Sequence, residues 1–107
     1  LKAMRAHLGS SLVQYKGCAA LANLAVSEVE QAKVSRLGGA KAALRAMDVH
    51  LQDTAVLEHC LGALHNLASL ADNRPNITAA GADMSLQKVM SKNKGSAEVQ
   101  RLGRKLQ

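Results

Sequence analysis

The sequence predicts an all-α protein, built as a right-handed α-solenoid, on three observations. Ala and Leu account for 35 of the 107 residues, whereas Pro occurs once and Phe and Trp are absent. This composition has too few β-branched and aromatic residues for a typical β-sandwich or barrel, and it is too apolar for a disordered tail. Apolar residues recur at helical spacing, and the pattern repeats after 43 residues. One such unit cannot bury its own apolar face, but stacked neighbours can.

The internal repeat sets the expected domain organisation. VQYKGCAALANLA at 13–25 matches VLEHCLGALHNLA at 56–68. The same offset of 43 residues pairs Gly38 with Gly81 without a gap. We therefore expect a single domain, 1–107, of about two and a half repeats. They comprise a partial repeat 1–25, a complete repeat 26–68, and 69–107 with a C-terminal cap.

The first elements are expected to be helices with an apolar face. Residues 1–8 have the pattern of a helix from the interior of such a stack, with the preceding part of the stack missing. The next helix has a face spaced 4, 4 and 3 residues apart, formed by Val13, Gly17, Leu21 and Leu24. A shorter helix, Glu28 to Leu37, follows. Ser27 and Glu30 form a capping-box pattern at its start, and the glycine pair 38–39 predicts its end.

The second repeat carries equivalent signals. Two apolar helix faces are expected, formed by Ala40, Ala43, Leu44 and Met47 and by Val56, Cys60, Leu64 and Leu67. Asp53 and Ser96 stand 43 residues apart and are expected to be N-caps. Pro75, just after Asn73, is placed where a first-turn proline is tolerated. Each period is thus predicted to be a triplet of a short, a medium and a longer helix.

No chemistry of catalysis, metal binding or thiol oxidation is expected. Cys18 and Cys60 are 42 residues apart, one off the repeat, so they occupy different helix faces and should be buried, reduced thiols. His59 and His65 lack the spacing of metal ligands on a helix. His7 and His50 are equivalent positions of the repeat, and both are expected at a helix end, where a positive charge interacts favourably with the helix dipole. The serines lie at caps and turns and no phosphate loop follows a strand, so we expect no enzyme activity and no cofactor.

Several motifs together resemble armadillo repeats of the beta-catenin-like family. They are AALANLA at 19–25, GALHNLA at 62–68, and the glycine turns RLGGAKAAL at 36–44 and AAGADMSL at 79–86. HEAT repeats share the architecture but usually lack the glycine turn and the asparagine. The resemblance implies a non-enzymatic protein-interaction module, a scaffold whose third helices line a concave peptide-binding groove. It further implies that Asn23 and Asn66 hold the backbone of an extended peptide, and an Asn amide can donate and accept at once.

The neighbours of the two asparagines indicate which ligand the groove would take. Helical spacing places Lys16 and Ala19 beside Asn23, and His59 and Gly62 beside Asn66. Importin-alpha-type repeats carry Trp where Ala19 and Gly62 stand, so the tryptophan array that sandwiches lysine is absent. An acidic or neutral peptide or protein is therefore favoured over a basic one. The alternative for each asparagine is a structural hydrogen bond to a neighbouring loop or helix end.

A basic segment near the C-terminus offers a second hypothesis. Residues 88–105 contribute +5 of the formal charge of +6 through Lys88, Lys92, Lys94, Arg101, Arg104 and Lys105, opposed by Glu98. This segment could bind nucleic acid or an anionic surface. A polar cap over the last apolar face is the favoured interpretation, and there are too few aromatics to stack bases. A third hypothesis is a structural scaffold repeat with no ligand of its own.

The expected location is intracellular, cytoplasmic or nuclear. The longest apolar stretch, 18–26, has 9 residues, too few to span a membrane, and no signal-peptide pattern is present. No membrane partner is expected. An open stack end would expose Leu8, Leu12 and their neighbours, so self-association through that end is expected.

Overall fold

The computed structural model describes residues 1–106, which form eight α-helices and one 3-10 helix and contain no strand. The all-α prediction is therefore confirmed. The helices are α1 (Lys2–Ala6), α2 (Ser11–Leu24), α3 (Glu28–Arg36), α4 (Gly39–Val49), α5 (Thr54–Ala68), η1 (Ala71–Asn73), α6 (Arg74–Ala79), α7 (Ala82–Lys92) and α8 (Ala97–Leu106).

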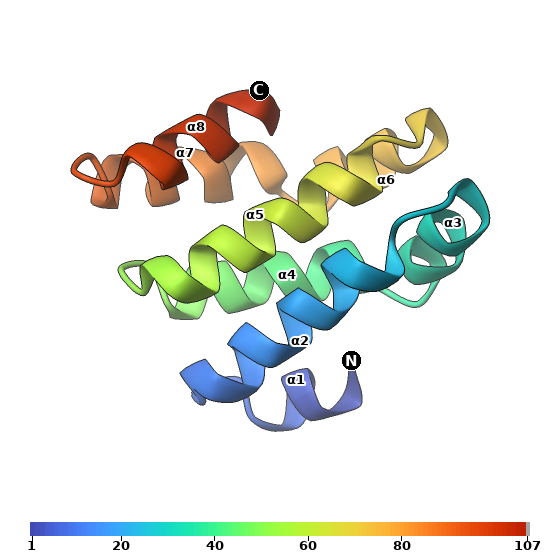
Figure 1. Ribbon diagram of the computed structural model, residues 1–107, viewed down its shortest axis with the longest axis horizontal. Helices are drawn as coiled ribbons and strands as arrows, with labels where there is room; N and C mark the ends of the chain where they lie inside the picture. The colour runs from blue at the N-terminus through green and yellow to red at the C-terminus, as the bar shows by residue number, and fades with distance from the viewer. Residues whose placement is uncertain (107) are drawn as a thin grey trace.

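Six of the helices are arranged in two layers. Helices α2, α5 and α8 lie side by side in one layer, with α1, α4 and α7 behind them, and α3 and α6 lie at one end (Figure 1). Within the first layer α5 packs against both α2 and α8, while α4 packs against α5 and α7. Helix α5 therefore lies at the centre of the molecule, with a neighbour on each side.

Helices α2, α5 and α8 start with the same kind of N-cap, as the repeat predicts. Ser10, Asp53 and Ser96 each accept a hydrogen bond from the backbone N–H three residues later, at 3.2 to 3.3 Å. Ser27 caps α3 in the same way, since its hydroxyl accepts from the Glu30 N–H at 3.4 Å. These side chains satisfy backbone donors that the first turn of a helix leaves without partners. The expected N-caps are confirmed.

Removing the cap of the central helix should destabilise the fold measurably. We expect Asp53→Ala to lower the free energy of unfolding by about 1 kcal/mol, because the Val56 N–H loses its partner. Urea unfolding followed by circular dichroism measures the change. Asp53→Asn, which keeps the accepting oxygen, should retain most of the stability. Asp72→Ala, at an exposed acidic residue without such a bond, is the matched control; an equal loss in both alanine variants would contradict the capping role.

The predicted glycine turns are also present. Gly38 and Gly81 precede α4 and α7 with φ of +88° and +93°, a left-handed conformation that strains other residues. Because they stand one period apart, both repeats turn into these helices in the same way. Pro75 lies in the first turn of α6, as expected. Asn73 does not cap that helix; its Nδ2 instead donates to the carbonyls of Leu67 and Gln31, at 3.0 and 3.2 Å.

The predicted apolar faces differ in how completely they are buried. The four residues of α4 and the four of α5 are all buried, as expected. Of the equivalent four on α2, only Leu21 is buried, and Leu24 is 54% exposed. The expectation that this whole face lies in the core is therefore wrong. The reason is positional, because α5 has the long helix α2 beside it, whereas the matching side of α2 is contacted by the five-residue α1, whose Met4 packs against Gly17.

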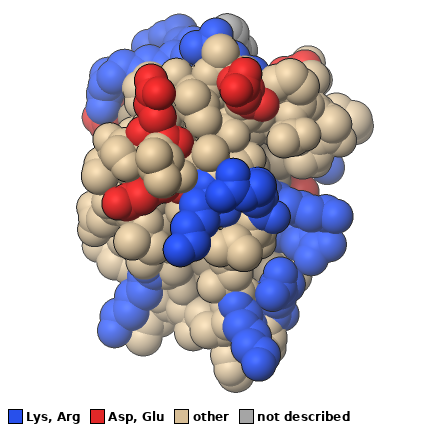
Figure 2. Space-filling model, turned by 90° about the vertical axis from the view of Figure 1, so that its right-hand side faces the viewer, with Lys and Arg blue, Asp and Glu red and all other residues tan. Residues whose placement is uncertain are grey.

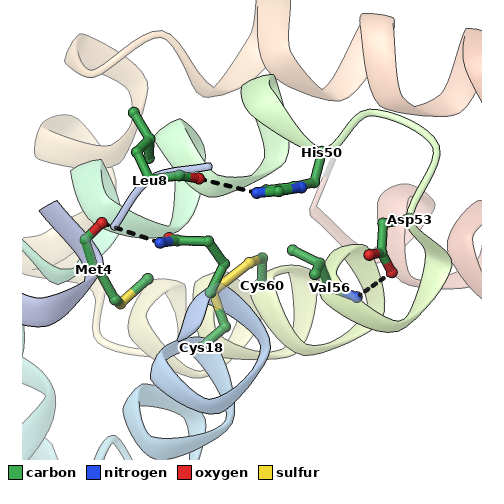
Figure 3. Close-up of a disulfide and its surroundings, with 8 residues drawn as sticks. Met4, Leu8, Cys18, His50, Asp53, Val56 and Cys60 are labelled. Atoms are coloured by element: carbon green, nitrogen blue, oxygen red, sulfur yellow. Dashed lines mark hydrogen bonds between the residues drawn. A yellow bond between two sulfur atoms is a disulfide. The ribbon is translucent and has the colours of Figure 1, made fainter. Parts of the chain in front are cut away.

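The expectation that the two cysteines remain reduced is wrong. Cys18 of α2 and Cys60 of α5 form a disulfide, with Cα atoms 4.9 Å apart and both side chains fully buried (Figure 3). The one-residue shift from the repeat does place them on different helix faces. Stacked helices touch through opposite faces, however, so a residue facing forward from α2 meets one facing backward from α5. The spacing of 42 residues, which the sequence analysis took as evidence against a disulfide, is therefore what allows the two cysteines to face each other.

Two glutamines, Gln14 fully buried and Gln100 partly buried, tie helix pairs together at equivalent places. Gln14 of α2 donates to two carbonyls at the end of α1, both at 3.0 Å. Two periods later, Gln100 of α8 donates to the two matching carbonyls at the end of α7, at 2.9 and 3.0 Å. The residue between them in the repeat is Leu57, which is fully buried. The outer repeats thus use a polar link where the central one uses apolar packing.

Candidate functional site

The six residues predicted to line a groove lie on two adjacent helices. Lys16, Ala19 and Asn23 are on α2, whereas His59, Gly62 and Asn66 are on α5. All six are at least partly exposed to solvent. Helices α2 and α5 pack along their length, so the two rows run next to each other (Figure 1).

The two asparagines differ in their partners. Asn66 Nδ2 donates to the Ala22 carbonyl at 2.9 Å and so links α5 to α2. This is the structural role foreseen as the alternative, and it leaves the Asn66 side-chain oxygen as an acceptor. Asn23 is exposed, and its side chain makes no hydrogen bond within residues 1–106. Asn23 therefore offers its whole amide to a ligand, whereas Asn66 keeps its oxygen and one of its two N–H groups.

A ring pair that the sequence analysis did not identify lies beside the predicted rows. The rings of Tyr15 and His59 stack with centroids 4.3 Å apart and an interplanar angle of 27°. Tyr15 directly precedes Lys16, so the pair joins the starts of both rows. Tyr15 and His59 are 44 residues apart, one more than the repeat, just as Cys18 and Cys60 are one fewer. Positions with such an offset lie on the facing sides of α2 and α5.

A hollow of about 380 Å³ lies where the C-terminal half of α5 meets the last helices. Its apolar part includes Leu64, Ile77 and Leu86, and its polar part includes His65, Arg74, Lys105 and Asp83. Lys105 occupies the repeat position of Gly62, which places the hollow next to the end of the predicted rows. Arg74 also donates to the Ala68 carbonyl at 2.8 Å. Basic groups outnumber acidic ones at this hollow.

The six residues of the predicted basic patch are all exposed. Lys88 and Lys92 are on α7, Lys94 follows it, and the other three are on α8. Arg101 forms an ion pair with Glu98, and this hydrogen bond lowers the pKa of Glu98 and raises that of Arg101.

Positive charge also marks the opposite end of the chain. Residues 1–45 carry seven Lys and Arg against two Asp and Glu, whereas residues 46–87 carry one against five. Lys and Arg side chains gather at the lower end of the molecule as well as along its upper edge (Figure 2). The view that the net charge belongs to the C-terminal segment alone is therefore incomplete.

The described residues hold no group of three or more His, Cys, Asp and Glu side chains placed to share a metal ion. Among the same residues, no helix is both long enough and apolar enough to cross a membrane. The chain has no match among protein-family models, curated proteins or solved structures.

Proposed function

We propose that this chain is part of an armadillo-like solenoid and acts as a non-enzymatic protein-interaction module. Its ligand is an extended acidic or neutral segment of a partner protein, bound along α2, α5 and α8. The observation that carries the proposal is the register of α2 and α5. The bond from Asn66 to Ala22 and the stack of Tyr15 on His59 hold the two rows of groove residues side by side.

The rows support backbone recognition of a peptide. Asn23 can donate to a peptide carbonyl and accept from a peptide N–H, while the Asn66 oxygen can still accept. Ala19 and Gly62 leave room for a backbone to approach, and a Cβ at Gly62 would meet no atom within 4 Å. Packed helices are roughly 8–10 Å apart, and an extended chain rises about 3.3 Å per residue. Asn23 and Asn66 would therefore contact peptide residues that are about three positions apart.

The charges beside the rows favour acidic side chains in the ligand. Lys16 lies at one end, and Lys105 and Arg74 lie at the hollow at the other. Opposite charges across an interface increase the association rate and disfavour wrong partners. A basic peptide would meet like charge at both ends.

Nucleic-acid binding through residues 88–105 has less support. Residues 1–45 carry the same net charge of +5 as this segment, so net charge does not single the segment out. Tyr15, the chain's one aromatic residue, is stacked on His59 and lies outside the segment. Modules that bind single strands use exposed aromatic rings as stacking platforms.

Two labelled peptides of opposite charge test the groove. The probes are a 12-residue peptide of alternating Glu and Ala and the same peptide with Lys for Glu, titrated by fluorescence anisotropy at low salt. We expect the acidic probe to bind at least about tenfold more tightly. Asn23→Ala should weaken its binding about three- to tenfold, the effect of losing one or two hydrogen bonds.

Asn76→Ala, at an exposed asparagine of α6, is the matched control and should leave binding unchanged. Asn66→Ala also removes the hydrogen bond to Ala22, so a change in its peptide affinity could reflect lost stability. The unfolding curve of this variant is therefore measured as well. Equal affinity for the two probes, or an Asn23→Ala chain that binds like the unmodified one, would refute the groove and favour a scaffold repeat without a ligand.

A further inference from the structure

The outer side of α1, α2 and α3 forms the N-terminal face, which is apolar and uncovered. Leu24 and Leu37 are 54% and 58% exposed. The face contains a hollow of about 440 Å³ lined by Leu1, Arg5, Gly17, Ala20, Leu21, Leu24, Val34 and Leu37. Large exposed apolar surface of this kind usually marks an interaction site.

The repeat shows what covers this kind of face. The residue equivalent to Leu24 one period later is Leu67, which is fully buried. Likewise Ala20 is exposed, whereas its equivalent Ala63 is fully buried. In the second repeat these positions are covered by α2, which packs along α5. The N-terminal face therefore has the side chains of a stacking surface without its neighbour.

Hydrogen-bond donors repeat in the same way. His50 Nε2 donates to the Leu8 carbonyl at 2.9 Å (Figure 3), and one period later Asn93 Nδ2 donates to the Leu51 carbonyl at 2.7 Å. These bonds join the end of one helix to the loop of the preceding repeat. The matching residue of the first repeat, His7, is exposed and its ring has no hydrogen bond within residues 1–106.

Within residues 1–106, Asn23 on α2 is, like His7, a free donor whose equivalent one period later is hydrogen-bonded to the preceding repeat. Its equivalent, Asn66, donates to a carbonyl of the preceding repeat, at Ala22. His7 and Asn23 thus present two donors on the side where that preceding repeat would place its carbonyls. Apolar burial and hydrogen bonding point independently to the same kind of neighbour.

Charge decides between the occupants that would fit this face. The repeat next to residues 1–45 in the structure, 46–87, is acidic, with five Asp and Glu against one Arg. Residues 1–45 and 88–105 are both basic, so two copies of this chain joined through either end would bring like charges together. Arg104 also stands where Cys18 and Leu61 point toward the next repeat, which makes the C-terminal side polar.

We propose that the N-terminal face is the stacking surface for a further helical repeat of the same 43-residue pattern, acidic in surface. This repeat covers Leu24 and Leu37 and accepts hydrogen bonds from His7 and Asn23. The inference does not depend on peptide binding in the groove. It explains why an exposed face has the composition of a core.

An extension of the full chain tests the proposal. Residues 44–86 are added ahead of Leu1, which keeps the register because residue 1 stands two periods before residue 87. The added Cys60 is changed to Ala so that no extra thiol is present. We expect a monomer whose unfolding midpoint is at least about 5 °C above that of the unextended chain. An extension with residues 1–43, with Cys18→Ala, has the same register but basic charge and should give a smaller rise.

Single substitutions identify the face that is used. Leu24→Asp should lower the midpoint by less than about 2 °C in the unextended chain and by more than about 6 °C in the extended one, where it buries a charge. His7→Ala with Asn23→Ala should show the same contrast. Met84→Asp, at a residue 67% exposed on α7, is the control and should act equally in both chains.

Three results would overturn the proposal. One is an added segment that leaves the midpoint unchanged. Another is a Leu24→Asp shift that is equal in the two chains. The third is a dimer of the unextended chain, seen by light scattering and dissociated by Leu24→Asp, which would assign the face to a second copy.

Discussion

Reduction of the Cys18–Cys60 disulfide is expected to lower the free energy of unfolding by about 3–4 kcal/mol. The bond closes a loop between residues 42 apart, so cutting it returns conformational entropy to the unfolded chain. Both sulfurs are fully buried between α2 and α5, so the native packing itself should survive reduction. For a chain of this size the midpoint of thermal unfolding should fall by about 15 °C, measured with and without a reductant.

The double variant Cys18→Ala with Cys60→Ala is the control for this experiment. Its midpoint should lie near that of the reduced protein and should not respond to reductant. Thiol titration of the unfolded, unreduced protein should find no reactive thiol, since the two cysteines of the chain are paired. Two reactive thiols, or a midpoint that ignores reductant in the unmodified chain, would contradict the disulfide.

The same bond bears on where the protein is found. Disulfides persist mainly in oxidising compartments, whereas cytosolic thiols are kept reduced. The bond therefore weighs against the cytoplasmic or nuclear location expected from the sequence. Complete burial slows attack on the disulfide, because thiol exchange requires access to sulfur. Trapping the thiols of the protein on expression in the cytosol and in the periplasm measures how far each compartment oxidises them.

Truncating Leu61 in the central helix is the substitution with the largest expected effect on packing. Leu61 is fully buried in α5, which contacts α2 on one side and α8 on the other. Leu61→Ala should lower the free energy of unfolding by about 3 kcal/mol, the sum of lost apolar transfer and a residual cavity. Urea unfolding followed by circular dichroism measures it.

The position of α5 makes this loss hard to avoid. A helix at the end of a stack can shift outward to close a cavity, whereas a helix packed on both sides cannot. Leu12→Ala is the matched control, because Leu12 is 61% exposed on α2 and should change stability by less than about 0.5 kcal/mol. Similar losses for the two variants would mean that α5 is not the centre of the core.

The amino-acid sequence alone determined the local structure of this protein. The all-α class, the caps at Asp53 and Ser96, the first-turn Pro75 and the glycine turns were all predicted correctly. Each depends on residues within one or two helical turns. Side-chain capping, a fixed proline φ and the left-handed conformation of glycine act at that range, so the pattern of residues is sufficient to place them.

The tertiary structure alone decided how equivalent residues are used. Leu24 and Leu67 are identical and one period apart, yet the first is exposed and the second buried. The pairs Cys18 with Cys60 and Tyr15 with His59 join positions offset by 42 and 44 residues, which the 43-residue repeat does not relate. Helical periodicity identifies the face on which a residue lies, but burial and pairing depend on which helix lies opposite that face. In a stack that helix presents its other side, so partners stand one residue away from the repeat.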